Sequence, residues 1–447
     1  MTDGPDLFSG FPPEAFRARR ERYLQRAGGA VTVLPAAPER YRSRDTELRF
    51  RQDSDFHYLT GFPEADAVAV LSPHEAERRF TLFVRPRDPE REAWSGARVG
   101  VEGAKERFGA DAAYPLDELD KHLRDLLLPA EEVVYTLGAH PEMDRRVTAL
   151  LGGFRRTRPR TGTGPLVIRD PDTLLAEMRL VKEPAELELH RRAARITAEG
   201  HRAAMRAARP GIGEWELEAL LDGHFRAAGG GGPAYPTIVG SGAGATVLHY
   251  VANDRRARDG DLVLIDAGAE VGMYAGDITR TFPVSGRFSP AQRAVYEVVL
   301  EAEEAAIAAV RPGAPVLEAH DAAVRVLTRG MVELGLLAGD VDELIRDGGH
   351  RRFYMHQTSH WLGLDVHDVG PYRRAGGEPV LLEPGMVLTI EPGIYVPESA
   401  EDVPAELRGI GVRIEDNAVV TADGHELTTR GVPVSVAEVE ALVGSGA

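Results

Sequence analysis

A chain of 447 residues with 43% hydrophobic and 28% charged residues is long enough for two globular domains with substantial cores. Its net charge of −17 argues against nucleic acid and anionic membranes as partners. The absence of cysteine excludes disulfides, thiol catalysis and zinc–thiolate sites. No apolar run has the length of a membrane span, and the amino terminus lacks a basic segment followed by an apolar one. The sequence therefore predicts a cytoplasmic protein.

The first part of the chain alternates predicted helices and strands. A helix begins at Pro13, and a second one is predicted over 116–128. The predicted strands lie at residues 30–35, 67–71, 80–84 and 132–137. The segment 152–165, rich in Gly, Pro and Thr, is predicted to be a surface loop before a short strand at 166–168. Together these elements predict an α/β domain over residues 1–178, without a phosphate-binding glycine loop or a catalytic cluster.

The second part, residues 179–447, combines long helices with apolar strands. The predicted helices span residues 182–209, 215–228, 290–310 and 315–336. Two of these helices end at Arg-Pro-Gly, at 209–211 and 311–313. Runs of helices around a mostly antiparallel sheet are typical of an α+β domain.

One predicted hairpin in this second part carries the first candidate site. Val263–Ile265 and Ile278–Phe282 are predicted strands, joined by a turn at 271–272. That turn would place Asp266 opposite Asp277, with Cβ atoms about 4.5–5.5 Å apart. Two carboxylates in a mostly apolar sheet repel each other and are costly to desolvate. A shared proton or a bound cation would relieve the repulsion, and the later acidic residues favour a cation; a solvated or turn-capping aspartate is the structural alternative.

Further candidate ligands lie nearer the carboxyl end. Three histidines are clustered between residues 355 and 368: His356, His360 and His367. Glu391 ends an apolar strand before a turn, and Glu415 lies on another β-branched strand. Alternation places Arg413 on the same face as Glu415. The structural alternatives are a solvated glutamate and an ion pair between Arg413 and Glu415.

A candidate ligand set with four carboxylates and one imidazole consists of Asp266, Asp277, His360, Glu391 and Glu415. Its four negative charges match two divalent cations. An oxygen-rich set without sulfur suits Mn²⁺, Co²⁺, Mg²⁺ or Zn²⁺. Two such metals about 3.5–4 Å apart can hold a bridging water, lower its pKa and polarise a carbonyl. The set therefore predicts a hydrolytic centre with two metals.

The sequence around these residues resembles a known family. The segments 262–282, 356–370, 383–395 and 409–416 resemble the metal-binding motifs of the pita-bread metallopeptidases. Within that superfamily the chain is similar to the bacterial Xaa-Pro aminopeptidases (aminopeptidase P), and segment 51–62 resembles their amino-terminal domain. The resemblance implies an α+β fold, with a carboxyl-terminal pita-bread catalytic domain preceded by a smaller α/β domain. It also implies two divalent metal ions per chain, Mn²⁺ foremost.

The resemblance implies a role for each candidate ligand. Asp277 and Glu415 would bridge the metals, and Asp266 would chelate one of them. His360 and Glu391 would bind the other metal. Glu391 would also carry the proton from the nucleophilic hydroxide to the leaving amine.

Substrate contacts are implied in the same way. His249 and His367 would contact the substrate backbone and stabilise the tetrahedral intermediate. His356 would line the proline pocket, and Arg413 would support a carboxylate ligand. Gln357 stands where some members of the family have glycine.

Two residues of the first domain match positions that reach a neighbouring subunit's site in oligomeric members of the family. They are Asp45 and Trp94. The resemblance therefore implies a homo-oligomer, either a dimer or a tetramer.

The implied function is hydrolysis of the N-terminal Xaa-Pro bond of peptides through a metal-bridging hydroxide, on substrates with proline at the second position. Prolidase, a dipeptidase for Xaa-Pro that shares the ligands, is the alternative enzyme. A non-catalytic pita-bread interaction module is a remote alternative, because such modules have lost ligands and all five are present here. A creatinase-like hydrolase would also lack the carboxylate set.

Overall fold

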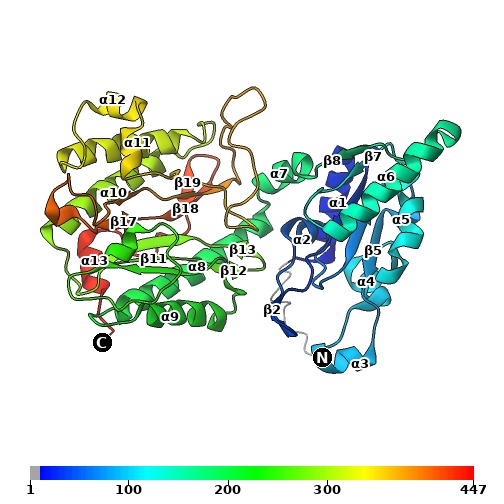
Figure 1. Ribbon diagram of the computed structural model, residues 1–447, viewed down its shortest axis with the longest axis horizontal. Coiled ribbons are helices and arrows are strands. Elements are labelled where there is room, and N and C mark those ends of the chain that lie inside the picture. The colour runs from blue at the N-terminus through cyan, green and yellow to red at the C-terminus, as the bar shows by residue number, and fades with distance from the viewer. Residues whose placement is uncertain (1–10, 447) are drawn as a thin grey trace. The chain divides into compact units, whose positions relative to one another are not determined.

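The computed structural model describes residues 11–446, which form two compact units that divide between residues 178 and 179 (Figure 1). Each unit has its own sheets and its own apolar core. No helix within residues 11–446 is both long enough and apolar enough to cross a membrane.

The first unit is an α/β domain built on a six-stranded mixed sheet, in the order β6-β5-β4-β1-β7-β8. Its strands are β1 Val31–Pro35, β4 Val68–Leu71, β5 Phe80–Val84, β6 Ala112–Pro115, β7 Glu132–Val134 and β8 Val167–Arg169, and a separate ribbon pairs β2 Tyr41–Ser43 with β3 Thr46–Glu47. Its helices are α1 Pro13–Ala27, α2 Ser54–Thr60, α3 Pro89–Ser95, α4 Gly100–Phe108, α5 Leu119–Leu127 and α6 Pro141–Thr161. Helix α7, Asp172–Leu180, crosses the division between the units.

Helix α6 contradicts the loop predicted for residues 152–165. Met143, Val147 and Phe154 repeat at helical spacing and are buried in the core of the first unit. The helix continues to a left-handed cap at Gly162, with φ +71°. Glycine and proline lower helix propensity by only about 1–3 kcal/mol per residue, so the packing of this apolar face decides the structure.

The second unit is an α+β domain in which every strand pair found within residues 179–446 is antiparallel. Its sheets have the orders β10-β11-β14, β13-β12-β9, β15-β18-β19 and β16-β17. The strands are β9 Gly232–Pro233, β10 Ile238–Ser241, β11 Leu262–Ala267, β12 Ala269–Val271, β13 Tyr274–Ala275, β14 Ile278–Pro283, β15 Val387–Ile390, β16 Gly393–Tyr395, β17 Gly411–Arg413, β18 Asp416–Val420 and β19 His425–Leu427. The helices are α8 Pro184–Ala207, α9 Glu214–Ala227, α10 Pro290–Ala309, α11 Glu318–Glu333, α12 Val341–Arg346 and α13 Val436–Leu442.

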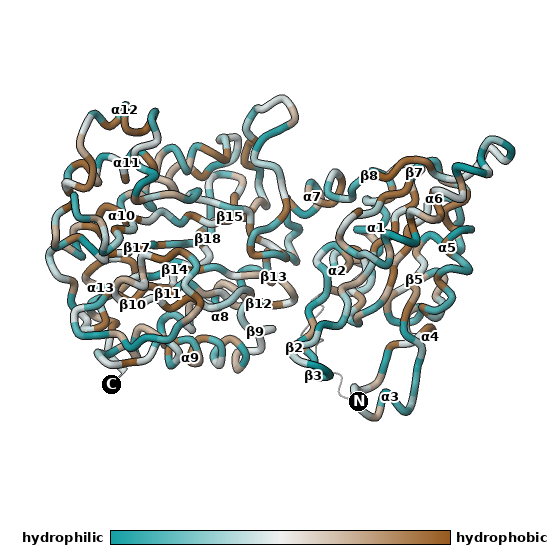
Figure 2. The backbone as a smooth tube through the Cα atoms, in the orientation of Figure 1, coloured by the Kyte–Doolittle hydropathy of each residue, from teal (hydrophilic) through white to brown (hydrophobic). Residues whose placement is uncertain are grey.

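The long helices of this unit lie in two pairs with the strands between them. Helices α8 and α9 are on one side of the strands, and α10 and α11 are on the other (Figure 1). Helix α10 begins with a capping box between Ser289 and Gln292. The apolar strands lie between helices whose outward turns are hydrophilic (Figure 2). The four helices predicted for this part of the chain are confirmed.

The hairpin of strands β11 to β14 has a different register from the one predicted. Its turn lies one residue later, at Gly272 and Met273, which both have positive φ (+56° and +69°) as a type I′ turn requires. Asp266 consequently pairs with Thr279. The predicted pairing of Asp266 with Asp277 is wrong, because Asp277 lies in the break between β13 and β14.

His190 in α8 is a buried neutral histidine that makes the second unit sensitive to acid. Its Nδ1 lies 3.1 Å from the carbonyl oxygen of Ala275, its Nε2 lies 3.3 Å from the hydroxyl of Thr428, and burial lowers its pKa to about 4. The unfolded chain therefore binds a proton here before the folded chain does, so stability is lost as pH falls below about 6.5.

We expect the wild-type chain to lose about 2 kcal/mol of stability between pH 7 and pH 5 relative to His190→Asn. Asparagine retains a donor for the carbonyl of Ala275 and does not titrate in this range. Chemical denaturation of both proteins at the two pH values measures the difference. A difference that stays constant between pH 7 and pH 5 would contradict this account of His190.

Candidate metal centre

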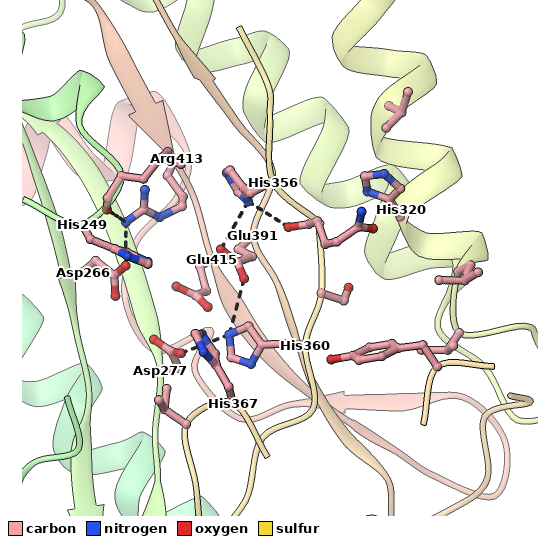
Figure 3. Close-up of a pocket in the computed structure, with 18 of the residues that line it drawn as sticks. His249, Asp266, Asp277, His320, His356, His360, His367, Glu391, Arg413 and Glu415 are labelled. Carbon is pink, nitrogen blue, oxygen red and sulfur yellow. Dashed lines mark hydrogen bonds and ion pairs between the residues drawn. The ribbon is translucent and has the colours of Figure 1, made fainter. Parts of the chain in front are cut away.

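A cavity of about 1140 Å³ in the second unit collects acidic and histidine side chains from breaks in the strands (Figure 3). Asp266 is near the end of β11, and Asp277 lies between β13 and β14. Glu391 lies between β15 and β16, and Glu415 lies between β17 and β18. His360 precedes an isolated bridge between Trp361 and β15. Asp266 is still paired in the ladder, with Thr279, but at the other positions the ladder is interrupted, so the chain can turn the polar side chains into the cavity.

Asp277, His360 and Glu415 form the tightest group in the cavity, with one ligand atom from each lying within 4.8 Å of the others. The Nε2 atom of His360 is 3.5 Å from Asp277 Oδ2 and 3.4 Å from Glu391 Oε1. The Nδ1 atom of His360 lies 3.0 Å from the carbonyl oxygen of Trp361, so the neutral ring carries its proton on Nδ1. Burial lowers the pKa of His360 to about 4. Its Nε2 lone pair is therefore available to a metal.

The carboxylates of the cavity carry more negative charge than the protein itself balances. Burial, with repulsion from Asp266, raises the pKa of Asp277 well above its usual range. Burial, with repulsion from Asp277, does the same to Glu415, and burial raises the pKa of Glu391 to about 8. Buried carboxylates that face one another with a bare imidazole nitrogen between them are the donor set of a divalent cation. The residues present therefore fit a metal.

Among the arginines that line this cavity, Arg413 is the buried one and it lies beside the candidate ligands. Its Nη2 lies 2.6 Å from Asp266 Oδ2, its Nη1 donates to the hydroxyl of Tyr395 at 3.0 Å, and its Nε donates to Thr279 Oγ1 at 3.1 Å. Strand β17 ends at Arg413. The side-chain alternation of a strand, which predicted Arg413 on the same face as Glu415, therefore does not continue to Glu415. Arg413 therefore pairs with Asp266 instead of Glu415.

The other histidines singled out in the sequence also line the cavity. His249 and His367 are exposed, and the ring of His367 lies edge-on to that of His360 with centroids 4.5 Å apart. His356 places Nε2 2.8 Å from the hydroxyl of Tyr395, and its Nδ1 is 3.7 Å from Glu391 Oε2. Burial lowers the pKa of His356 to about 3. His356 is therefore a neutral hydrogen-bonding group beside Glu391.

Asp45 and Trp94 belong to the first unit and do not line this cavity. Asp45 is exposed in the turn between β2 and β3. Trp94 is 93% exposed on α3.

Three residues that sequence reasoning missed support the carboxylates. The hydroxyl of Tyr235 donates to Asp266 Oδ1 at 2.7 Å and also contacts Asp277 Oδ1, so it bridges the two acids. Thr279 donates to Glu415 Oε2 at 2.7 Å. The side chain of Asn417 accepts from the backbone N–H of Asp277 and donates to its carbonyl oxygen, at 3.0 and 2.6 Å. The correct hairpin register would have placed Thr279 opposite Asp266. No sequence pattern near Tyr235 or Asn417 indicates that these residues contact the carboxylates.

A buried carboxylate and histidine cluster, carried on antiparallel strands between two helix pairs, defines a metal-dependent hydrolase. Residues 188–422 match metallopeptidase family M24, and residues 16–135 match the aminopeptidase P N-terminal domain. The chain belongs to metallopeptidase family M24. The predicted resemblance and the predicted fold, a pita-bread domain preceded by a smaller domain, are confirmed.

Known proteins resemble the chain over nearly its full length. It is 45% identical to the Xaa-Pro aminopeptidase of Escherichia coli (strain K12), over 96% of this chain and 97% of that protein. The structure of Pseudomonas aeruginosa aminopeptidase PepP superposes with a TM-score of 0.93 at 50% identity, covering 97% and 98% of the two chains. Zinc-substituted aminopeptidase P of E. coli in complex with product gives 0.92 at 45% identity, covering 97% and 98%.

Proposed function

We propose that this protein is an Xaa-Pro aminopeptidase, which removes the first residue from peptides that have proline at the second position. The observation that carries the proposal is one cavity in which His356, hydrogen-bonded to the buried Tyr395, lines the wall beside Glu391. The E. coli and Haemophilus influenzae relatives named Xaa-Pro aminopeptidase, similar over 96% and 97% of this chain, support it.

The proposed metal ligands are five side chains that line the cavity: Asp266, Asp277, His360, Glu391 and Glu415. We propose two ions per chain, with Mn²⁺ as the native metal. When bound, such ions acidify water and polarise a carbonyl. Four carboxylates and Arg413 carry a net charge of −3, and two divalent ions would change this net charge to +1.

The chain's own residues would supply orientation and proton transfer. Glu391, buried beside His356 and His360, is the group we propose to take a proton from the attacking water and deliver it to the leaving proline nitrogen. His249 and His367 would donate to the substrate's backbone oxygens as charge develops there. Arg413 would hold Asp266 in its orientation.

Proline explains why a separate pocket is needed. An Xaa-Pro bond is a tertiary amide with no N–H to donate, and its φ is fixed. A site that recognises proline therefore uses ring packing instead of a hydrogen bond from that nitrogen. The ring of His356, held at 2.8 Å to the hydroxyl of Tyr395, is the proposed packing surface.

We also propose that the protein is cytoplasmic and forms a dimer or tetramer. The exposed Asp45 and Trp94 would then reach the cavity of a second copy. The carboxylate of Asp45 suits the terminal ammonium of a peptide, and Trp94 suits proline. Sedimentation of the active protein as a monomer would contradict this arrangement.

The function is tested by comparing kcat/KM for Xaa-Pro-Yaa, Xaa-Pro and Xaa-Ala-Yaa under one metal condition. We expect the tripeptide with proline to be the best substrate of the three. Preference for the bare dipeptide would identify a prolidase, which shares the ligands. Equal rates for alanine and proline would end the proline-specific proposal.

A further inference from the structure

The cavity extends beyond the carboxylates towards α11. At about 1140 Å³ it exceeds the range of roughly 300–1,000 Å³ that is typical of ligand pockets. Its far side is lined by apolar residues of α11, its leading turn and α12, namely Val316, Leu317, Val324 and Ile345. None of the metal or proline contacts proposed above uses this side. It therefore has room for a part of the substrate that those contacts leave unassigned.

His320 on α11 is a polar group of this far side, and its tautomer follows from its partners. The backbone N–H of Thr358 donates to His320 Nδ1 at 3.2 Å, and the Thr358 hydroxyl lies 2.9 Å from the same nitrogen. A backbone N–H can only donate, so Nδ1 is bare and the proton of the neutral ring is on Nε2. Burial lowers the pKa of His320, which keeps the ring neutral. Nε2–H has no hydrogen-bond partner among residues 11–446, and the ring lines the cavity.

Contacts through Tyr354 and Thr358 link His320 to the proposed reaction centre, where His356 and Glu391 lie (Figure 3 labels His320, His356 and Glu391). The rings of His320 and Tyr354 are 6.0 Å apart, and those of Tyr354 and His356 are 4.9 Å apart. The hydroxyl of Tyr354 lies 2.6 Å from Thr358 Oγ1, and the carbonyl of Thr358 accepts from the backbone N–H of Glu391 at 2.8 Å. In the series of rings His356 therefore lies between Glu391 and His320, and all three residues line the cavity.

That order gives the direction of a bound peptide. If the scissile bond lies at Glu391 and the proline ring packs on His356, the chain that follows the proline runs towards α11. We infer that the α11 side of the cavity binds this following residue, and that His320 Nε2–H donates a hydrogen bond to its carbonyl oxygen. The inference rests on the proposed function and adds a residue that selects peptides longer than a dipeptide. His320 is thus a substrate-binding residue, fixed in its tautomer by Thr358.

Two substitutions separate this role from a structural one. His320→Asn places an amide oxygen near the position of Nδ1, so it retains an acceptor for Thr358 and removes the donor that reaches the cavity. His320→Gln places an amide N–H near the position of Nε2, so it retains that donor. Thermal melting of the metal-loaded proteins checks that both variants are folded.

The substrates are Xaa-Pro-NH₂ and Xaa-Pro-Yaa-NH₂, which share an uncharged carboxyl end and differ by the residue after proline. For the longer amide we expect His320→Asn to raise KM about fivefold with kcat unchanged, because one neutral hydrogen bond is lost. KM for Xaa-Pro-NH₂ should not change, and His320→Gln should restore the wild-type value for the longer amide. Calorimetric binding of the unreactive Pro-Yaa-NH₂ and prolinamide should show the same fivefold loss for the former alone.

The outcomes distinguish this inference from the proposed function. Wild-type protein that hydrolyses neither proline amide would overturn the proposed function and this inference with it. Hydrolysis of both amides with the same KM in wild type and His320→Asn would overturn the inference alone. An equal rise in KM for both amides, or no restoration by His320→Gln, would show that His320 acts on the fold of the cavity and would also overturn it.

Discussion

We expect Glu391→Gln to lower kcat about 10²–10⁴-fold while leaving KM nearly unchanged, because a positioned acid–base group is lost. Glutamine has the shape of glutamate and still fills the space 3.4 Å from His360 and 3.7 Å from His356. It cannot take up or deliver a proton. Burial raises the pKa of Glu391 to about 8 in the metal-free chain, so the group is suited to proton exchange near neutral pH.

The measurement pairs steady-state kinetics with metal analysis, because altered metal occupancy would also slow turnover. Glu383→Gln is the matched control: Glu383 is exposed, precedes the same strand β15 and does not line the cavity. We expect the control to have wild-type kcat. A Glu391→Gln protein that holds both metals and turns over at a near-normal rate would remove Glu391 from the proton path.

The candidate site was largely predictable from the sequence, because its acidic residues interrupt apolar strands. Asp277, Glu391 and Glu415 each stand in a break between two strands, and a charge in an apolar run is visible without a structure. The dense histidines between residues 355 and 368 gave the same kind of signal. The sequence pattern did not show which carboxylate pairs with Arg413. In the folded chain Arg413 forms an ion pair with Asp266, 147 positions away, and not with Glu415.

The fold was predictable where helical periodicity and capping agreed, and less so where tertiary packing decided. Helix α10 has a capping box and a proline at its start, and its bounds followed from them. Helix α6 crosses glycines and a proline because Phe154 is buried in the core, which no local propensity shows. The hairpin turn was displaced by one residue because Met273 adopts a positive φ that is uncommon for such a side chain. Tyr235 follows a glycine run and reaches the aspartates only in the folded chain.

We expect removal of the metals to abolish activity and to lower the melting temperature, by an amount that grows as pH rises from 5 to 8. Burial raises the pKa of Glu391 to about 8 in the metal-free chain, and burial with repulsion between the carboxylates raises the pKa values of Asp277 and Glu415 well above their usual range. A carboxyl whose pKa is higher in the folded chain than in the unfolded chain favours folding while it is protonated. That contribution is present below the unfolded pKa of about 4 and is lost as pH rises through the folded pKa. Bound divalent ions neutralise the negative charges of these carboxylates, so the stability of the metal-loaded protein does not fall in this way as pH rises.

Calorimetric melting of chelated and Mn²⁺-loaded protein at pH 5 and pH 8 tests the expectation, and Glu415→Gln identifies its cause. Glutamine is neutral without taking up a proton, so in the chelated protein at pH 8 the substitution avoids the cost of burying this carboxyl, and we expect it to raise the melting temperature above that of wild type. In the loaded protein it removes a ligand, so we expect it to lower the melting temperature. Full activity after exhaustive chelation would contradict the metal requirement. A substitution that shifts the melting temperature in the same direction in both states would show that the buried carboxyl of Glu415 does not limit the stability of the metal-free fold. The opposite signs are expected only if burial beside the other carboxylates makes Glu415 unfavourable without metal.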